Sequence, residues 1–194
     1  MIIPLFPVLL HEIAIPDFKD IEKNLIKTSY QQRKKDPKGR IISNRGGWQS
    51  SIFRGEDNII RSTLFSSLSS YFESNKIFEC DIGVDGWWIN INGKGDYNEL
   101  HHHHSCELSG VFWIKTPKNS GNLEFTSPHD FVQAKELKYY SSQVKEDCKE
   151  FDRYHFSPTA GFIMVFPSFL LHQVRPNQST EDRISVSFNL LLNK

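Results

Sequence analysis

Four consecutive histidines, His101 to His104, are the residues of this 194-residue chain best suited to metal chemistry. Side chains at positions i and i+2 of a β-strand point to the same face, so His101 and His103 can bind one metal ion together. His172 lies much later in the chain, after an apolar run, and can supply a third imidazole. Three such ligands on one side of a metal leave its other positions open to small molecules. The pattern therefore predicts a metal centre that performs chemistry.

A pair of residues suited to a carboxylate follows the third histidine. Arg183 and Ser185 are again two positions apart, so on a strand they share one face. A guanidinium donates two parallel hydrogen bonds to a carboxylate, and a neighbouring hydroxyl adds a third. We therefore expect a metal that carries a dicarboxylic co-substrate, whose far carboxylate rests on Arg183 and Ser185.

The histidine run also has simpler interpretations. It could bind metal adventitiously at the surface, or its imidazoles could satisfy one another through hydrogen bonds in the core. An expression tag does not fit, because the run is internal and embedded in strand-like sequence. The register is also open, since His102 and His104 satisfy the same strand geometry. Glu99 and Glu107 are the nearby acids that could replace a histidine ligand.

Composition narrows the classes of partner. Lys plus Arg equals Asp plus Glu, 23 each, so no global field favours nucleic acid or an anionic membrane. Three cysteines, an odd number without metal-type spacing, favour a reducing compartment. Residues 1–10 are apolar but lack a basic lead and a cleavage site, so they predict an N-terminal strand rather than a signal peptide. No apolar run approaches the roughly 20 residues of a membrane span. We expect a cytoplasmic protein with neither a membrane nor a nucleic acid as partner.

The elements that must position these residues fall into two groups. Apolar residues with a helical period predict helices that begin at Asp17 and near Asn58, joined through a loop at 42–50 around Gly46 and Gly47. Beyond Cys80 the chain changes to short β-type runs broken by turns, at 86–91, 99–103, 110–115, 122–126, 161–166, 172–174 and 184–191. Such runs predict a barrel or a two-sheet jelly roll. The expected fold is mainly β, with helical support over about 17–79 and a jelly-roll core over about 82–192 in a single domain.

The segment 129–157 interrupts this rhythm of short strands. It has mixed charge and a weak helical pattern over 135–151. A lid over the site and a solvated connection both fit this composition, and we favour the connection.

The ordered series of motifs resembles the 2-oxoglutarate/Fe(II)-dependent oxygenase superfamily, and more narrowly the oxygenases of this kind in marine bacteria and their phages. The resemblance covers nearly the whole chain and is carried by residues 43–50, 98–103, 109–111, 121–125, 166–168, 172, 176–177 and 183–189. It implies the double-stranded β-helix fold, a cupin-like jelly roll. By position it makes His101, His103 and His172 the catalytic metal ligands, with the motif at 109–111 fixing this register.

The resemblance also assigns the co-substrate site and shows one departure. Arg183 and Ser185 match the pair that holds the far carboxylate of 2-oxoglutarate. Asn98 is grouped with them, and together with Asn90 and Tyr97 it is expected to orient the imidazoles. Most members of the superfamily have Asp or Glu two residues after the first histidine, where this chain has a third histidine ligand, as the narrower family does. Such a site carries one less negative charge than usual.

The activity implied is that of a dioxygenase that uses Fe(II), 2-oxoglutarate and O2. It would release succinate and carbon dioxide while hydroxylating a small molecule or a peptide. Gln49 and Trp48, beside the Gly-Gly turn, are the expected substrate contacts. Two alternatives are a three-histidine cupin-like metalloenzyme that does not use 2-oxoglutarate and a non-catalytic metal-binding jelly-roll module. Neither alternative needs a carboxylate clamp at Arg183 and Ser185.

Overall fold

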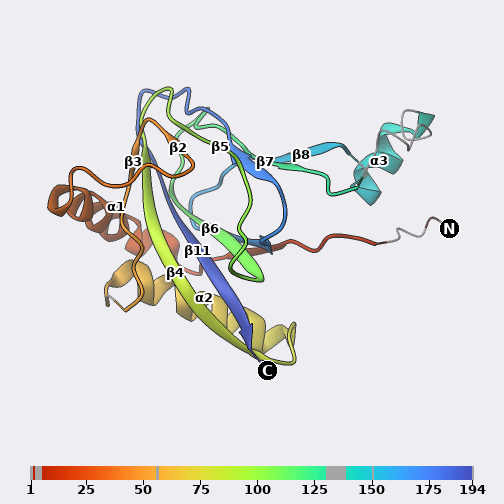
Figure 1. Ribbon diagram of the computed structural model, residues 1–194, viewed down its shortest axis with the longest axis horizontal. Helices are drawn as coiled ribbons and strands as arrows, with labels where there is room; N and C mark the ends of the chain where they lie inside the picture. The colour runs from red at the N-terminus through yellow and green to blue at the C-terminus, as the bar shows by residue number, and fades with distance from the viewer. Residues whose placement is uncertain (1, 3–5, 56, 130–138, 150, 194) are drawn as a thin grey trace.

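The computed structural model describes residues 2, 6–55, 57–129, 139–149 and 151–193 (Figure 1). Within these residues the chain forms eleven strands and three helices. In chain order they are β1 (His11–Ala14), α1 (Phe18–Lys35), β2 (Asn44–Arg45), β3 (Trp48–Gln49), α2 (Ile59–Asn75), β4 (Asp81–Asn92), β5 (Tyr97–His101), β6 (Leu108–Lys115), β7 (Leu123–Thr126), α3 (Ser142–Cys148), β8 (Arg153–Phe156), β9 (Phe162–Pro167), β10 (His172–Val174) and β11 (Arg183–Asn193).

The strands form two antiparallel sheets. One has the order β1-β9-β6-β11-β4-β3 and the other β2-β5-β10-β7-β8. From β4 onward the chain crosses repeatedly between the sheets, so that neighbours in space are distant in sequence. This connectivity is that of a two-sheet jelly roll, and it confirms the predicted double-stranded β-helix.

The two N-terminal helices are where the apolar periodicity predicts them. The helix α1 follows Asp17 and carries three basic residues in its last turn, where they favour the negative end of the helix dipole. The helix α2 begins after Asn58, whose side chain accepts hydrogen bonds from the backbone N–H groups of Ile60 and Arg61. Both helices lie on the same side of the long strands β4 and β11, whereas α3 lies at the opposite end of the molecule (Figure 1).

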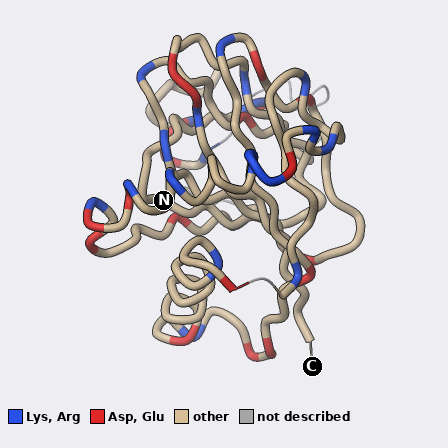
Figure 2. Tube along the Cα trace, turned by 90° about the vertical axis from the view of Figure 1, so that its left-hand side faces the viewer, with Lys and Arg blue, Asp and Glu red and all other residues tan. Residues whose placement is uncertain are grey.

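Charged residues of both signs are interspersed along the described chain, as expected for equal numbers of basic and acidic residues (Figure 2). None of the described helices is long and apolar enough to cross a bilayer.

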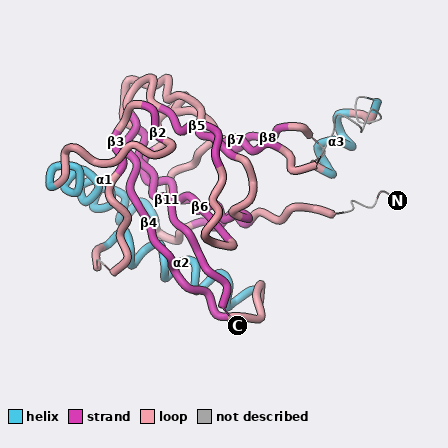
Figure 3. Tube along the Cα trace, in the orientation of Figure 1, coloured by secondary structure: helices cyan, strands magenta, loops and turns pink. Residues whose placement is uncertain are grey.

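The six-stranded sheet has two chemically different faces, which is why the site forms where it does. Alternate residues of β4, β6, β9 and β11 point toward α1 and α2 and form the main core, beneath the helices seen in Figure 3. On β11 this face carries Ile184, Val186 and Phe188, all fully buried. The residues between them face the second sheet. On this inner side lie a small apolar cluster and a polar stripe.

Strand register builds the polar stripe. On β4 and β11, Asn92 pairs with Arg183, Asn90 with Ser185, and Trp88 with Ser187. Paired residues of antiparallel strands project from the same face, so these side chains form one patch inside the jelly roll.

The structure departs from the predicted elements in several places. The loop predicted at 42–50 contains β2 and β3, which join different sheets, with Gly46 and Gly47 between them at φ 66° and 65°. The strand expected within 1–10 begins only at His11. The strand expected over 99–103 ends at His101, so His103 lies in the segment that follows.

The segment 129–157 contains one strand that the sequence did not indicate, β8, which pairs with β7. The helix α3 lies within the weak helical pattern at 135–151. Residues 130–138 and 150, which include part of that pattern, lie outside the described residues.

Candidate metal centre

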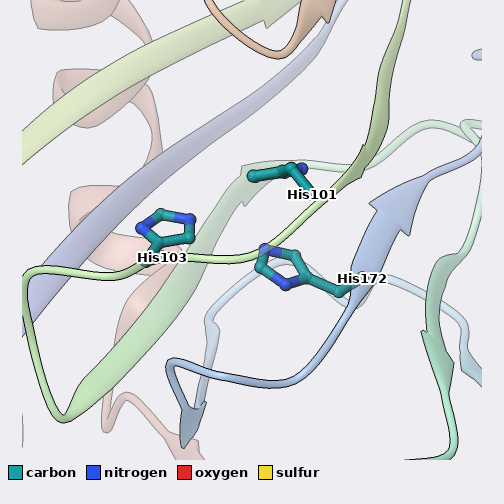
Figure 4. Close-up of side chains that lie close together, drawn as sticks. All are labelled: His101, His103 and His172. Carbon is teal, nitrogen blue, oxygen red and sulfur yellow. The ribbon is translucent and has the colours of Figure 1, made fainter.

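The fold brings His101, His103 and His172 together, with one ring nitrogen of each within 4.8 Å of those of the others (Figure 4). The ring centroids of His101 and His172 are 4.3 Å apart, and that of His103 is 5.3 Å and 5.4 Å from them. His101 ends β5 and pairs directly with His172 at the start of β10. The register of β5 and β10 in the second sheet therefore brings two of the three histidines together.

His103 reaches the cluster by a different route. It lies beyond β5, and its backbone N–H donates to the carbonyl of Ser168 at 3.0 Å. Ser168 in turn donates its N–H to the carbonyl of Glu107 and its hydroxyl to the carbonyl of Cys106. The turn after β9 thus holds the segment between β5 and β6, and it places His103 opposite His172.

Backbone carbonyls set the tautomers of two imidazoles. His101 Nδ1 is 2.7 Å from the carbonyl oxygen of Glu99, and His172 Nδ1 is 2.8 Å from that of Leu170. A carbonyl oxygen only accepts, so each Nδ1 carries the hydrogen and each Nε2 keeps its lone pair. A histidine held in this way presents Nε2 to a metal.

Burial keeps the three imidazoles neutral. Removal from water lowers the pKa of His172 to about 3 and that of His103 to about 4, and it also lowers the pKa of His101. The neighbouring imidazoles reinforce the effect, because two protonated rings at this separation would repel. Metal binding requires the unprotonated ring, so the cluster is in its ligating form at neutral pH.

Aromatic side chains enclose the cluster. The indole of Trp88 stacks on the ring of His103, with centroids 5.9 Å apart and planes at 19°. On the other side, Phe166 and Phe125 contact His172 with centroids 4.8 Å and 6.1 Å away. These rings limit the access of water, which strengthens electrostatic interactions in the site.

The other candidate ligands, His102, His104, Glu99 and Glu107, do not belong to the cluster of His101, His103 and His172. His102 and His104 pair with each other, with ring centroids 4.1 Å apart, and neither belongs to the cluster. Glu99 forms an ion pair with Arg45, and a carboxylate oxygen of Glu107 accepts the backbone N–H of Leu192. The structure therefore favours the register that begins at His101.

Arg183 is the most deeply buried charged residue of the site. Its side chain is 1% exposed, and its Nη1 donates to the carbonyl oxygens of Ser120 and Arg175. Its Nε and Nη2 have no hydrogen-bond partner among the described residues. Burial lowers the pKa of the guanidinium to about 10, so it is still charged at neutral pH. A buried cation with two free donors fits a carboxylate, which would supply both the charge and the acceptors.

Ser185, two positions after Arg183 on β11, lines the small cavity beside the imidazoles. Asn98 and Asn90 line the same cavity, but the amide of Asn98 donates to Ser43 Oγ at 3.3 Å and that of Asn90 to Ser187 Oγ at 3.1 Å. Tyr97 is 36% exposed. The expectation that these three residues orient the imidazoles is not what the structure shows, because backbone carbonyls orient His101 and His172.

The two expected substrate contacts have different surroundings. Trp48 belongs to the helix-side core, and its indole N–H donates to the carbonyl of Asp36 at 2.7 Å, so its role is structural. Gln49 is also buried, with an Oε1 that has no partner among the described residues, and its contact with substrate stays a prediction. The tryptophan that lines the cavity is Trp88, which strand alternation places opposite the core residue Trp87.

Comparison with solved structures identifies the same fold in enzymes. A prolyl-4-hydroxylase from Pseudomonas putida aligns with a TM-score of 0.63 and 15% identity, over 98% of this chain and 95% of that one. A Trichoplax adhaerens prolyl hydroxylase, solved with a hypoxia inducible factor peptide fragment, aligns with a TM-score of 0.63 and 13% identity, over 95% and 83%. The non-heme alpha ketoglutarate dependent carbocyclase SnoK of nogalamycin biosynthesis aligns with a TM-score of 0.65 and 13% identity, over 96% and 80%.

These likenesses show the double-stranded β-helix fold, and the family that the sequence matches defines the class as a 2-oxoglutarate/Fe(II) oxygenase. Residues 86–189 match the family described as "Putative 2OG-Fe(II) oxygenase", and the chain belongs to this family. No curated protein matches the chain in sequence. The protein is thus a 2-oxoglutarate-dependent oxidoreductase that uses Fe(II) and O2.

Proposed function

We propose that His101, His103 and His172 hold the Fe(II), and that Arg183 and Ser185 hold the far carboxylate of 2-oxoglutarate. When bound, Fe(II) would activate O2, with one oxygen atom entering succinate as 2-oxoglutarate loses carbon dioxide and the other becoming the hydroxyl group of the product. The observation that carries the proposal is the buried guanidinium of Arg183, which has two donors without partners among the described residues. It lies on β11, the strand that also carries the cavity-lining Ser185.

The protein's contribution is placement and electrostatics. The carbonyls of Glu99 and Leu170 hold the rings of His101 and His172, so that Nε2 of each faces the cluster. The carbonyls of Ser120 and Arg175 hold Nη1 of the guanidinium, and its Nε and Nη2 have no hydrogen-bond partner in the part of the chain that the structure describes. A carboxylate bound there pairs with a charge that is already desolvated, so the attraction is stronger than at the surface.

We further propose that residues 1–194 act as one oxygenase domain on a small molecule or a peptide in the cytoplasm. The helices share one core cluster with the six-stranded sheet, which supports a single folding unit. The three cysteines are free, which is typical of a reducing compartment. Basic and acidic residues are equal in number, so the chain has no net positive charge to attract duplex nucleic acid.

The decisive experiment is an anaerobic titration of the Fe(II)-loaded protein with 2-oxoglutarate. Chelation of Fe(II) by a 2-oxo acid gives a visible metal-to-ligand charge-transfer band, which should appear in the wild type. In the Arg183→Ala variant the band should appear only at much higher 2-oxoglutarate, because the far carboxylate has lost its partner. A band at wild-type concentrations in Arg183→Ala would contradict the clamp.

Two further variants separate this effect from misfolding. Arg183→Lys keeps the positive charge but loses the planar fork, so we expect intermediate binding. Arg153→Ala removes an arginine of the surface whose partner is Glu124, and it should titrate as the wild type does. Circular dichroism of each variant establishes that the fold is retained.

A further inference from the structure

Asn92 at the end of β4 and Arg183 at the start of β11 share an environment that is rare for polar side chains. Each is 1% exposed, and the two are register partners. Seven buried side-chain polar atoms have no hydrogen-bond partner among the described residues, and four of them belong to this pair. These four are Nδ2 and Oδ1 of Asn92 and Nε and Nη2 of Arg183. Buried polar groups are almost always hydrogen-bonded, so this concentration indicates a place where a ligand binds.

The free donors of Asn92 and Arg183 suit a carboxylate. Side chains of register partners project from the same face with Cβ atoms about 4.5–5.5 Å apart, so the amide of Asn92 lies beside the guanidinium. A carboxylate accepts up to about four hydrogen bonds, so one that is bound to Nε and Nη2 of Arg183 can also accept from Nδ2 of Asn92. Asn90, the previous residue of β4 on this face, differs because its Nδ2 already donates to Ser187 Oγ.

The position of Asn92 is fixed by its backbone and by a neighbouring glycine. Its carbonyl accepts from Nδ2 of Asn177 at 2.9 Å, and the next N–H, that of Gly93, donates to Asp96 Oδ2 at 2.7 Å. A Cβ added to Gly47 would lie 2.8 Å from Nδ2 of Asn92, so this glycine makes room for the amide. The amide is therefore held in place although its own side-chain atoms form no hydrogen bond among the described residues.

We propose that Asn92 is a specificity-determining residue of the co-substrate site, where its amide donates to the same far carboxylate that Arg183 binds. This inference rests on the proposed function. A 2-oxo acid with an apolar end would leave the amide and the guanidinium buried and unpaired. A site built in this way discriminates strongly against a ligand that lacks the matching group.

The first test compares two co-substrates in the anaerobic titration of the Fe(II)-loaded protein. 2-Oxoglutarate and 2-oxovalerate have the same 2-oxo acid group and the same number of carbons, but a methyl group replaces the far carboxylate in 2-oxovalerate. Asn92→Leu keeps the shape of the side chain and removes its donor. It should weaken binding of 2-oxoglutarate by about 10–100-fold, as expected for a hydrogen bond to a charged group. Binding of 2-oxovalerate should not weaken, so the preference for 2-oxoglutarate falls by the same factor.

The second test measures urea unfolding without metal or co-substrate. Asn92→Leu removes two buried polar atoms that have no partner, so its urea midpoint should equal or exceed that of the wild type. Asn177→Leu is the matched control, because Asn177 is equally buried but its amide is satisfied. Its Nδ2 donates to the carbonyls of Asn92 and Glu181, and its Oδ1 accepts the N–H of Ser179. The midpoint of this variant should fall.

The outcomes separate this inference from the proposed function. If the wild type gives no charge-transfer band with 2-oxoglutarate, the proposed function is wrong and this inference falls with it. If Arg183→Ala weakens 2-oxoglutarate binding while Asn92→Leu keeps the wild-type preference over 2-oxovalerate, only the role of Asn92 is wrong. A urea midpoint that falls as far in Asn92→Leu as in Asn177→Leu would make Asn92 a structural residue.

If Asn92→Leu does not fold, Asn92→Ala provides the same comparison of the two co-substrates, because it also removes the donor. A preference for 2-oxoglutarate that falls in Asn92→Ala supports the role of Asn92. An unchanged preference overturns it.

Discussion

At the scale of single residues, the candidate metal centre consists of three neutral imidazoles, and a buried cation, Arg183, lies in the other sheet. The three imidazoles bring no charge, because burial lowers their pKa values well below neutral pH. Arg183 brings a positive charge that has no acidic partner within hydrogen-bonding distance among the described residues. Asp96 is an acid whose charge acts on Arg183, and the imidazole cluster itself contains no acid, so a bound anion would add the negative charge that the cluster lacks. Fe(II) and the guanidinium together would carry three positive charges, so the two negative charges of 2-oxoglutarate would offset most of them.

The histidine register gives a direct prediction for paired variants. His103→Ala should weaken Fe(II) binding by more than the roughly 10–100-fold typical of an outer partner, because it removes a proposed ligand. His104→Ala should leave the affinity unchanged, since His104 pairs with His102 away from the cluster. Anaerobic Fe(II) titration of the two variants measures the difference. The reverse order of effects would move the site to the other register.

The side chains of the candidate site could be predicted from the sequence, whereas the groups that orient them could not. His101, His172, Arg183 and Ser185 lie on strands, where alternation fixes the face of each side chain once the strand is recognised. The orienting groups were not predictable in this way. Those of His101 and His172 are backbone carbonyls, which any residue can provide. His103 lies beyond the end of β5, so strand alternation does not predict where its ring points.

At the scale of elements, β11 supports the co-substrate half of the proposed site. Its inward-facing residues include Arg183 and Ser185, so this one strand would carry both residues of the proposed carboxylate clamp. The guanidinium rests on the turn before β7, where the carbonyl of Ser120 accepts from Arg183. The carbonyl of Arg175, just after β10, also accepts a hydrogen bond from Arg183.

Substitution of Gly121 tests whether these carbonyls set the position of Arg183. It has φ +87°, and a Cβ there would lie 2.1 Å from the carbonyl oxygen of Arg175, which accepts from Arg183. Gly121→Ala should lower the free energy of unfolding by more than the ~1–2 kcal/mol of a positive φ, and it should raise the KM for 2-oxoglutarate. Gly95→Ala is the control, because Gly95 has φ +88° with open space around its Cβ position. An unchanged KM in both variants would show that the carbonyl of Arg175 does not set the position of Arg183.

The elements themselves were predictable where local chemistry specifies them. Asp17 and Asn58 precede the two helices with the expected apolar periods, and both helices formed there. The strands β2 and β3 were not predicted, because each has only two residues and depends on partners in different sheets. The strand β8 escaped prediction for a similar reason, since its exposed and half-buried residues give no strong alternation.

At the scale of the whole molecule, the buried imidazoles link folding to pH. A histidine in the unfolded chain has a pKa of about 6.5, whereas in the folded protein the pKa is about 3 for His172 and about 4 for His103. Between these values the unfolded state binds more protons, so the folded state is fully favoured above about pH 6.5 and loses stability as the pH falls. Each group contributes at most about 1.4 kcal/mol per pH unit in this window.

Urea unfolding of the metal-free protein at pH 7 and pH 5 tests this linkage. The free energy of unfolding should be smaller at pH 5. His172→Gln removes one of the titrating groups, so the difference between the two pH values should shrink in this variant. Equal differences in the wild type and His172→Gln would mean that His172 is not responsible for the acid sensitivity.

The position of β11 in its sheet also has a consequence for synthesis on the ribosome. It lies between β4 and β6, both of which emerge well before it, and it pairs with each along most of its length. Until it emerges, the nascent chain exposes two unpaired strand edges in the middle of the future sheet. Such edges invite association with other chains, so this protein should depend on a chaperone during translation more than a fold whose last strand is added at an edge.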